Sequence, residues 1–454
     1  MDHSCPRLLI AGVSSGVGKT TFSVGLCRAL MRRGLSVAMF KCGPDYLDPT
    51  YLQRASGGVV HNLDSWLMPL PALRETFVRD AAQADISLVE GVMGLFDGAS
   101  ATELTGSSAE IARVLDSPIV LVCDVSGMAR SVAALPKGFA TFEVGISPSA
   151  VSCTLVGCPP HLELFERAQL AAAGAPILGG LPKRTASRFP ERHLGLVTAR
   201  ELANDELFEA WADQVEDHCD VAALVALARS AVPLAAASTG APKQAARCRI
   251  GVARDAAFHF YYDANLRLLE AAGAELVELS PLRDAELPQV DGLYIGGGYP
   301  ELHAAQLSAN RSMLESIRAH AQRRKPIYAE CGGLMYLCDA IVELDGTRHA
   351  QVGLIPGAAA MCDRLQALGY VECETRVATP LGPAGTRYRG HQFRYSKLET
   401  DCAPMRLDLH APRTGARHVE GYGADNVLAT YVHGHWASNP SIADAFVAAC
   451  LPAR

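Results

Sequence analysis

Short apolar runs alternate with amphipathic segments along most of the chain. The runs in the first half are RLLIAG, LSVAMFK, ISLVEG and SPIVLVCD, and those in the second half are RIGVARD, ELVELS, GLYIGG, PIYAEC and VLATYVHG. Continuous apolar runs of this length, bounded by Gly and Pro, are typical of strands buried on both faces of a parallel sheet. The pattern therefore predicts two doubly wound α/β halves, with ligands at the carboxyl ends of the strands.

The alternation breaks at residues 231–248, AVPLAAASTGAPKQAARC, where small residues, Pro and Gly replace the periodic hydrophobics. A chain of 454 residues is too long for one ordinary core, so two or three domains are expected. The break predicts one domain over 1–235 and a second over 248–454.

Composition narrows the class of protein. Hydrophobic residues make up 49% and charged residues 20%, as in soluble globular proteins. No apolar run is long enough to cross a bilayer, and the polar start of the chain argues against a signal peptide, so a cytoplasmic location is expected. The net charge of −7 argues against nucleic acid as the main partner. The 14 cysteines include no CxxC pair, which predicts reduced, buried thiols with one candidate nucleophile among them.

The first strand runs into a glycine loop, GVSSGVGKTT, and an amphipathic helix follows. Glycines let backbone N–H groups surround phosphate oxygens, and the helix N-terminus favours the same negative charge. The loop is a variant of the usual phosphate-binding motif, because Val13 stands at the position of the first glycine. Lys19 is expected on the β- and γ-phosphates and Thr20 on Mg²⁺. The predicted nucleotide-binding residues are Gly16, Gly18, Lys19, Thr20 and Thr21.

Two acidic segments follow neighbouring strands. Glu90 ends the strand ISLVEG, a usual place for a carboxylate that anchors Mg²⁺ or water beside a phosphate loop. Asp45 and Asp48 follow LSVAMFK and lie beside prolines, where aspartate is also common as a turn residue. We predict that Thr20, Asp45 and Glu90 bind the metal, whereas for Asp48 both interpretations stay open.

In the second half, the strand PIYAE leads to Cys331, and a helix is expected over LMYLCDAI. A nucleophile on a sharp strand-to-helix turn needs small residues two positions before and after it, and Ala329 and Gly333 meet that need. The helix N-terminus is expected to lower the pKa of the thiol. A second glycine loop, residues 296–298, is expected to direct backbone N–H groups at an oxyanion.

A cysteine nucleophile also requires a base, and the strand VLATYV delivers His433, followed by Gly434 and His435. We predict Cys331 and His433 as the catalytic pair. His435 stays open as an alternative base or as a supporting residue. The buried cysteines Cys27, Cys123 and Cys338 are interpreted as packing residues.

Together these residues resemble the cobyrinic acid a,c-diamide synthase family, glutamine amidotransferases of corrinoid biosynthesis. The resemblance covers nearly the whole chain. Its carriers are AGVSSGVGKTT, FKCGPDYLDPTYL, NLDSWLM, VEGVMGLFDG, YIGGGYPELHAAQLSAN, PIYAECGGLMYL, GLIPG, RYRGHQFRYS and ATYVHGHWASNP. It implies an N-terminal P-loop domain of the dethiobiotin-synthetase type and a C-terminal class I glutamine amidotransferase domain.

The resemblance also implies a reaction and its small-molecule partners: ATP, L-glutamine and cobyrinic acid, with Mg²⁺. ATP would convert the a and c acetate groups to acyl phosphates, and Cys331 would release ammonia from glutamine through a glutamyl thioester. Ammonia would then travel inside the protein to the acyl phosphate. Related glutaminases carry a carboxylate two residues after the histidine, where this chain has His435, which implies a Cys–His dyad rather than a triad. The oligomeric state is left open, a homodimer included.

Two stretches leave questions open. Where the family has Asn-Arg-Val-Gly, this chain has the residues of 154–157, Thr-Leu-Val-Gly, and the preceding segment from 138 shows poor periodicity. Thr cannot offer the paired donor and acceptor of an Asn amide, so either base recognition has changed or the segment is locally misread. The adenine contacts within 137–160 therefore stay open. The basic residues Arg387, Arg389, His391 and Arg394 are interpreted either as facing the polycarboxylate macrocycle or as a solvated strand.

Several rival functions remain at this point. Hydrogenobyrinic acid a,c-diamide synthase and sirohydrochlorin diamide synthase are rivals that differ from the cobyrinic acid enzyme only in the macrocycle they act on. A P-loop switch ATPase with a degenerate glutaminase-like domain would place a lysine five residues before Lys19, where this chain has Ser14. A synthase that uses free ammonia alone, with the second domain as a scaffold, is the third rival.

Overall fold

The computed structural model describes residues 2–3, 5–183, 199, 202, 204–235 and 245–452. The chain forms two compact units, Met1–Gly240 and Ala241–Arg454. Of the predicted break at 231–248, residues 236–244 lie outside the described residues. None of the helices in the described ranges is long and apolar enough to cross a membrane.

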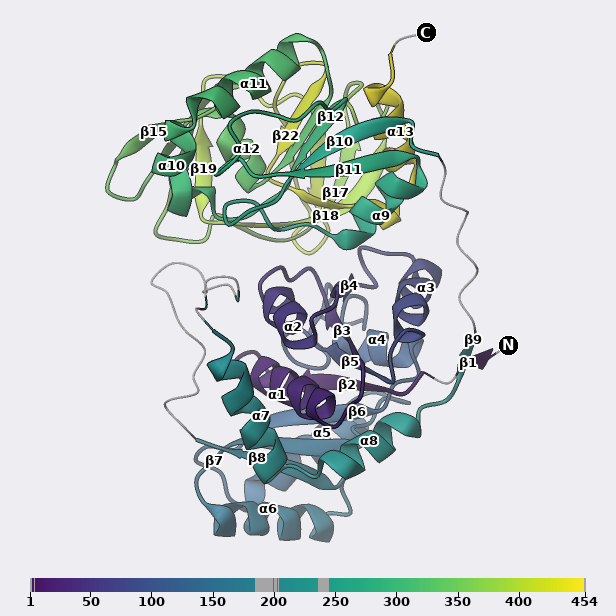
Figure 1. Ribbon diagram of the computed structural model, residues 1–454. Helices are drawn as coiled ribbons and strands as arrows, with labels where there is room; N and C mark the ends of the chain where they lie inside the picture. The colour runs from purple at the N-terminus through teal and green to yellow at the C-terminus, as the bar shows by residue number, and fades with distance from the viewer. Residues whose placement is uncertain are drawn as a thin grey trace. The chain divides into compact units, whose positions relative to one another are not determined.

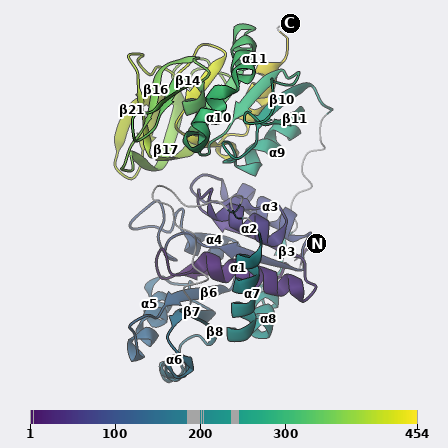
Figure 2. The ribbon, with the colours of Figure 1, turned by 60° about the vertical axis from the view of Figure 1, so that its left-hand side comes forward.

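The first unit is built on a seven-stranded parallel sheet in the order β4-β3-β5-β2-β6-β7-β8. The strands are β2 (Arg7–Gly12), β3 (Val37–Cys42), β4 (His61–Leu63), β5 (Ile86–Glu90), β6 (Ile119–Asp124), β7 (Ala150–Val156) and β8 (Ile177–Pro182), and a short pair joins β1 (Asp2–His3) to β9 (Leu234–Ala235). The four apolar runs predicted as strands in this half are confirmed. Their continuous apolar character follows from burial, since both faces of the sheet are covered (Figures 1 and 2).

Helices surround this sheet. They are α1 (Lys19–Arg32), α2 (Asp48–Ser56), α3 (Leu70–Ala81), α4 (Ser108–Val114), α5 (Ala134–Phe142), α6 (Pro159–Ala171), α7 (Glu206–His218) and α8 (Val221–Arg229), with the 3₁₀ turn η1 (Arg130–Ala133). Helix α1, which follows the phosphate loop, packs against α7 around the fully buried Trp211. The two helices approach closely at Gly25, where an added Cβ would lie 2.5 Å from the carbonyl oxygen of Trp211.

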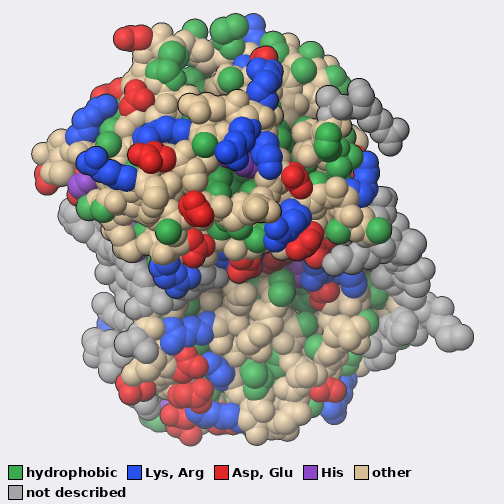
Figure 3. Space-filling view, turned by 45° about the horizontal axis from the view of Figure 1, so that its top comes forward, with side chains coloured by type: hydrophobic (Ala, Val, Ile, Leu, Met, Phe, Trp, Pro, Cys, Tyr) green, Lys and Arg blue, Asp and Glu red, His purple; other side chains and the backbone are tan. Residues whose placement is uncertain are grey.

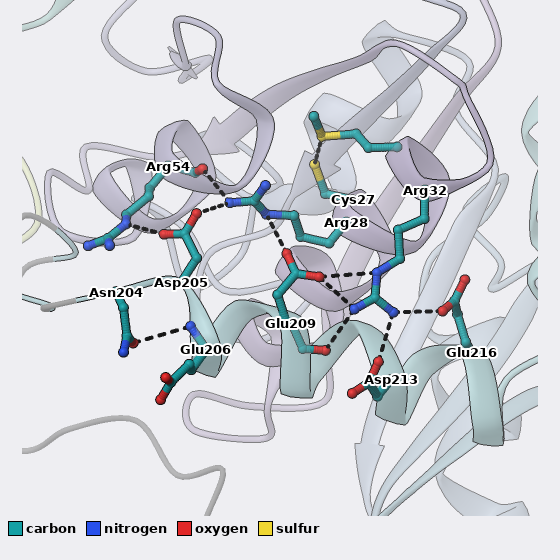
Figure 4. A network of polar contacts seen from close by, with 11 residues as sticks. Cys27, Arg28, Arg32, Arg54, Asn204, Asp205, Glu206, Glu209, Asp213 and Glu216 are labelled. Atoms are coloured by element: carbon teal, nitrogen blue, oxygen red, sulfur yellow. Dashed lines mark hydrogen bonds and ion pairs between the residues drawn. The ribbon is translucent and has the colours of Figure 1, made fainter.

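A network of ion pairs ties α7 to α1 and α2 (Figure 4). Asp205, at the start of α7, binds Arg28 of α1 and Arg54 of α2, both at 2.7 Å. Arg32 binds Glu209 and two further carboxylates one and two turns along α7. Single exposed pairs contribute little to stability, but this set is shared by three helices. Through Arg54 it also reaches α2, the helix that begins at a candidate metal residue, Asp48.

The segment from 138 to 157 contains a helix and a strand, contrary to its poor periodicity. Helix α5 covers the first part of it and strand β7 the last part. The strand pairs with β6 and β8 on its two sides, and these long-range contacts impose regularity that the local pattern lacks. Thr154 of β7 donates a hydrogen bond from Oγ1 to the carbonyl oxygen of Val17 at 2.7 Å. The residue that differs from the family pattern therefore binds the phosphate loop.

The second unit contains a five-stranded parallel sheet in the order β11-β10-β12-β13-β22. Its strands are β10 (Cys248–Ala253), β11 (Ala274–Leu279), β12 (Gly292–Ile295), β13 (Ile327–Glu330) and β22 (Val427–Thr430). Its helices are α9 (Asp263–Ala271), α10 (Ala304–Ala309), α11 (Arg311–Gln322), α12 (Gly332–Leu337) and α13 (Ser441–Cys450), with the turns η4 (Pro300–His303) and η5 (Trp436–Ser438). The predicted α/β class is confirmed in both units.

Two further sheets depart from the expected doubly wound arrangement of this half. One has the order β15-β14-β16-β19 and the other the order β21-β20-β17-β18-β23. Their strands are β14 (Cys338–Val342), β15 (Arg348–Ala350), β16 (Ile355–Met361), β17 (Ala367–Thr375), β18 (Arg387–Arg394), β19 (Ser396–Glu399), β20 (Leu407–Ala411), β21 (Ala416–Glu420) and β23 (His433–His435).

The helix predicted over LMYLCDAI is therefore wrong in its second half, because the chain turns into β14 at Cys338. Pairing of β14 with β16 and β15 stabilises the extended form. The run VLATYVHG also divides, since β22 ends at Thr430 and His433 begins β23 in another sheet.

Candidate functional sites

The phosphate loop connects β2 to α1 and has the backbone that its glycines predict. Gly16 and Gly18 have φ values of 75° and 93°, in the left-handed region that favours glycine. Lys19 is buried, and its Nζ donates to the carbonyl oxygens of Ser14 at 3.0 Å and Met93 at 2.7 Å. The ammonium group is thus held over the loop. Thr20 and Thr21 follow in the first turn of α1.

Three carboxylates converge near this loop on a lysine that the sequence analysis missed. Lys41, at the end of β3, is almost completely buried and binds Asp48 at 2.6 Å and Glu90 at 2.8 Å, with Asp45 at 3.7 Å. Glu90 also accepts a hydrogen bond from Thr20 Oγ1 at 2.9 Å. Asp45, Asp48 and Glu90 are therefore neighbours of one buried cation, and Thr20 joins the cluster through Glu90. The sequence feature that could have revealed Lys41 is its place inside an otherwise apolar strand, because lysine is rarely buried without a partner.

Asp45 has a structural role as well as a place in this cluster. Its Oδ1 accepts hydrogen bonds from the backbone N–H groups of Leu47 and Asp48. Aspartate commonly makes such hydrogen bonds in turns, as the alternative interpretation of Asp45 and Asp48 expected. Burial, reinforced by Asp48, raises the pKa of Asp45 to about 7. Burial opposes ionisation of Asp48 too, but the charge of Lys41 and the hydrogen bonds with Asp45, Lys41 and Glu90 together outweigh burial and lower the pKa of that carboxyl. The cluster therefore keeps Asp48 ionised more firmly than Asp45.

The side-chain oxygens of this cluster are of the type that Mg²⁺ binds, but they do not form a complete coordination shell. Among the residues that the structure describes, no group of three or more His, Cys, Asp or Glu side chains could hold a metal ion, and Lys41 lies where the carboxylates meet. Mg²⁺ usually takes one or two protein carboxylates and completes its shell with water and phosphate oxygens. The hydroxyl of Thr20 beside Glu90 fits that smaller donor set.

The second candidate site is the turn at Cys331, between β13 and α12. Cys331 has φ 48° and ψ −102°, a strained conformation for a residue with a side chain. A Cβ on Gly333 would lie 2.4 Å from the carbonyl oxygen of Ile295, so only glycine fits there. The geometry thus meets the requirement for a small residue two positions after the cysteine.

The glycine loop at 296–298 packs against this turn, but it differs from the expected oxyanion cradle. The N–H of Gly296 donates to Tyr261 Oη at 2.8 Å, and that of Gly297 to the carbonyl oxygen of Phe260 at 3.2 Å. Two of the three predicted donors are therefore engaged within the protein. The nitrogen of Gly298 lies 3.1 Å from where a Cβ on Gly332 would stand, which leaves it beside the turn.

His433 lies against the same loop. Its ring atom Cε1 is 2.4 Å from where a Cβ on Gly297 would stand. The ring of His435 instead lies 4.6 Å from the ring of Tyr262. The structure thus brings Cys331, His433 and the glycine loop together at the carboxyl ends of adjacent strands, β12, β13 and β22.

The thiol pKa runs against the expectation from the sequence. Burial raises the pKa of Cys331 to about 12, and Glu301 adds to the rise, whereas the Gly332 N–H and Arg394 oppose it. The expected lowering by a helix N-terminus is wrong, because α12 has only six residues and desolvation dominates. Burial, followed by the charge of His391, lowers the pKa of His433 to about 3. The resting pair is therefore a neutral thiol and a neutral imidazole.

Glu330, directly before Cys331, is a second residue that the sequence analysis missed. It is fully buried, and burial raises its pKa to about 7. Its Oε2 lies 4.0 Å from Nδ1 of His433. A glutamate at the end of an apolar strand was the available signal, as it was for Glu90.

The basic segment of β18 divides between two environments. Arg387 binds Glu374 at 2.8 Å and Arg389 lies 3.8 Å from Glu372, both on the neighbouring strand β17. These acidic partners favour the interpretation of a solvated strand for the two arginines. His391 is buried opposite His433, and Arg394 lies over the ring of Tyr431 at 4.3 Å.

Gly297 provides a test of this geometry. We expect Gly297→Ala to lower the rate of glutamine hydrolysis by about 10²-fold, because the new methyl group would displace His433 and displacements near 1 Å are that costly in active sites. Glutamate release from glutamine measures the effect. Gly138→Ala is the matched control, since a Cβ there meets no atom within 4 Å. Equal rates in both variants would contradict the assigned place of His433.

Comparisons with known proteins agree with this division into two sites. Residues 8–197 match the family model described as the CobQ/CobB/MinD/ParA nucleotide binding domain, and residues 249–441 match the CobB/CobQ-like glutamine amidotransferase domain. A cobyrinate a,c-diamide synthase from Leptospira interrogans is 46% identical, over 99% of this chain and 100% of the relative. Relatives of the same name from Syntrophotalea carbinolica and Listeria monocytogenes serovar 1/2a are 45% and 40% identical, over 98% and 95% of this chain and 99% and 97% of the relatives.

Proposed function

Because this chain belongs to the cobyrinate a,c-diamide synthase family, we propose that it converts the a and c acetate carboxylates of cobyrinic acid to amides, with glutamine as nitrogen donor and ATP as energy source. The observation that carries the proposal is the presence of two different sites in one chain. The loop around Lys19 suits phosphate, and the strained turn at Cys331 suits a nucleophile. A carboxylate is a poor electrophile and glutamine is a safe store of ammonia, so the reaction needs both.

In the glutaminase site, Sγ of Cys331 attacks the side-chain amide carbon of glutamine while the thiol proton passes to His433. His433 then returns that proton to the nitrogen as the C–N bond breaks, and ammonia leaves. The remaining γ-glutamyl thioester is hydrolysed by water, which yields glutamate and restores the thiol. Because both resting groups are neutral and buried, proton transfer creates a charge pair that its surroundings must stabilise.

In the nucleotide site, an oxygen of the substrate carboxylate attacks the γ-phosphorus of ATP and ADP leaves. Ammonia then attacks the acyl phosphate, and phosphate leaves as the amide forms. Lys19 is positioned on the loop to bind the phosphates, together with the backbone N–H groups of Gly16 and Gly18 and the first turn with Thr20 and Thr21.

Thr20, Asp45 and Glu90 would hold Mg²⁺, whose charge neutralises the phosphate oxygens when it is bound. Lys41 lies 2.8 Å from Glu90 and 2.6 Å from Asp48. It offsets the repulsion among these carboxylates and so keeps them close together before the nucleotide arrives.

We assign the carboxylate-activating role to residues 1–235 and the glutaminase role to residues 248–454. Small molecules are the expected partners. On the face shown in Figure 3, Lys and Arg side chains are interspersed with Asp and Glu, which differs from the continuous basic surface that nucleic acid requires.

The proposal is tested by supplying the purified protein with ATP, Mg²⁺ and cobyrinic acid, and either glutamine or ammonium. We expect two successive products, each with one hydroxyl exchanged for an amino group and resolved by mass. Metal-free and nickel-containing macrocycles supplied in parallel identify the preferred ring. ATP hydrolysis without any amide, for every macrocycle and both nitrogen sources, would contradict the proposal and favour a switch ATPase.

A further inference from the structure

The proposed steps leave the buried carboxylate of Glu330 without a role. Its Oε1 accepts hydrogen bonds from Tyr328 Oη at 2.6 Å and from the N–H of Gly434 at 2.9 Å. Its Oε2 accepts one from Tyr294 Oη at 3.1 Å. Three donors directed at one carboxyl favour its ionised form, and a buried carboxylate is costly unless it is bound in this way.

This carboxylate holds the strand that carries His433. The N–H of Gly434, the next residue, donates to Glu330, while the carbonyl oxygen of Gly434 accepts from Asn265 Nδ2 at 2.7 Å. Asn265 Oδ1 also accepts from the N–H of Trp436 at 2.8 Å. Glu330 and Asn265 thus fix β23 from two sides, and with it the backbone from which the imidazole extends.

Glu330 also faces the ring itself, since its Oε2 lies 4.0 Å from Nδ1 of His433. A negative charge on that side favours the tautomer with hydrogen on Nδ1, which leaves Nε2 to accept a proton. Distances of this kind are often long without substrate and shorten when the reacting complex forms. The sequence position two residues after His433 is occupied by another histidine, His435, so a carboxylate is not supplied from there.

We propose that Glu330 is the positioning residue for His433 in the glutaminase site. It orients the imidazole through Gly434 and Nδ1, and it stabilises the imidazolium that forms when His433 takes the proton of Cys331. The proton then moves to the departing nitrogen, so Glu330 neither gains nor loses a proton over the cycle. The proposal rests on the proposed glutaminase function and replaces the Cys–His dyad with a triad whose carboxylate precedes the nucleophile.

The electrostatics of the site agree with such a role. Burial raises the pKa of Glu330 to about 7, whereas Tyr328, Gly434 and Tyr294 lower it. The carboxyl is therefore protonated below about pH 7 and ionised above it. The other titratable groups that interact with Glu330 are Tyr261, Tyr388, Cys373 and Cys331, besides His433. All except His433 titrate well above neutrality in this site.

The test compares Glu330→Gln with Glu420→Gln in the full-length protein. Glu420 is a matched control, because it is also a buried carboxylate of this unit and is bound by the N–H of Tyr431 at 2.7 Å and by the hydroxyl of Thr430. We expect Glu330→Gln to lower kcat for glutamate release by about 10- to 100-fold with little change in KM, since it removes the charge but not the shape. Glu420→Gln should keep kcat near that of the unsubstituted protein.

The pH profile separates positioning from a merely structural role. The kcat of the unsubstituted protein should rise through about pH 7 as Glu330 loses its proton, and Glu330→Gln should abolish that rise. Tyr328→Phe removes one donor but keeps the carboxylate, so it should shift the rise to higher pH. This second variant also serves if Glu330→Gln does not fold.

Each outcome decides a different question. An unchanged kcat in Glu330→Gln, an equal loss in Glu420→Gln, or an unshifted profile in Tyr328→Phe would overturn the role of Glu330. A complete lack of glutamate release by the unsubstituted protein would instead contradict the proposed glutaminase function itself.

Discussion

Replacing Cys331 by serine is expected to lower glutamine-dependent amidation by at least about 10³-fold, because the loss of a covalent nucleophile removes the reaction path itself. Amidation supported by ammonium should persist, since ammonia needs only the acyl phosphate. Product formation with each nitrogen source, followed by mass, measures both. The split between the two sources is the distinguishing result of a two-site synthase.

Cys338→Ser provides the matched control for that experiment. Cys338 is also buried in the second unit, seven residues away, and its Sγ contacts the carbonyl oxygen of Leu334 at 3.2 Å. We expect no selective loss of glutamine use from this change. Equal activity of Cys331→Ser with both nitrogen sources would contradict the role of Cys331 in releasing ammonia from glutamine. Amidation by the unsubstituted protein with ammonium but not with glutamine would mean that the second domain is a scaffold and that free ammonia is the substrate.

Replacing Lys19 by alanine is expected to impair amidation with both nitrogen sources but to leave glutamine hydrolysis intact. Amidation should fall by about 10²- to 10³-fold with glutamine and with ammonium alike, because the positive charge over the phosphates is lost in the synthetase step. Hydrolysis of glutamine in the absence of the macrocycle should continue, since its residues belong to the other unit. Parallel assays of amide, ADP and glutamate measure the three quantities.

The control for Lys19→Ala is Arg167→Ala, on α6, which removes an exposed positive charge from the same unit. It tests whether loss of any positive charge from this unit affects ATP use. Undiminished amidation by Lys19→Ala would contradict the assignment of the loop as the phosphate site. A loss of glutamate release as well would indicate that the substitution affects more than the nucleotide site.

The sequence by itself determined four of the seven strands of the first parallel sheet, all five of the second, the phosphate loop and the turn at Cys331. These features are local: a buried parallel strand needs a continuous apolar run, and a tight turn needs glycines at fixed spacing. Gly16, Gly18 and Gly333 could be read as necessary because only glycine fits their backbone or their space. Glu90 was predicted to bind the metal from a local feature as well, because it ends a strand beside the phosphate loop.

Only the tertiary structure decided which charges meet. Lys41 and Glu330 stand in apolar strands without a local motif, and their partners come from other strands and loops. The chain after Leu337 becomes β14 rather than helix because β15 and β16, which come later in the sequence, pair with it. The strand at 150–156 likewise depends on β6 and β8.

The chemical state of the site was also decided by the tertiary structure. Spacing indicated that Cys331 is placed on a turn before a helix, which alone predicts a lowered thiol pKa. Burial from all sides raises that pKa instead, and it lowers the pKa of His433. Residue order encodes backbone geometry, because that geometry depends on neighbours in the chain. Burial and long-range charge depend on neighbours in space, and these exist only once the chain has folded.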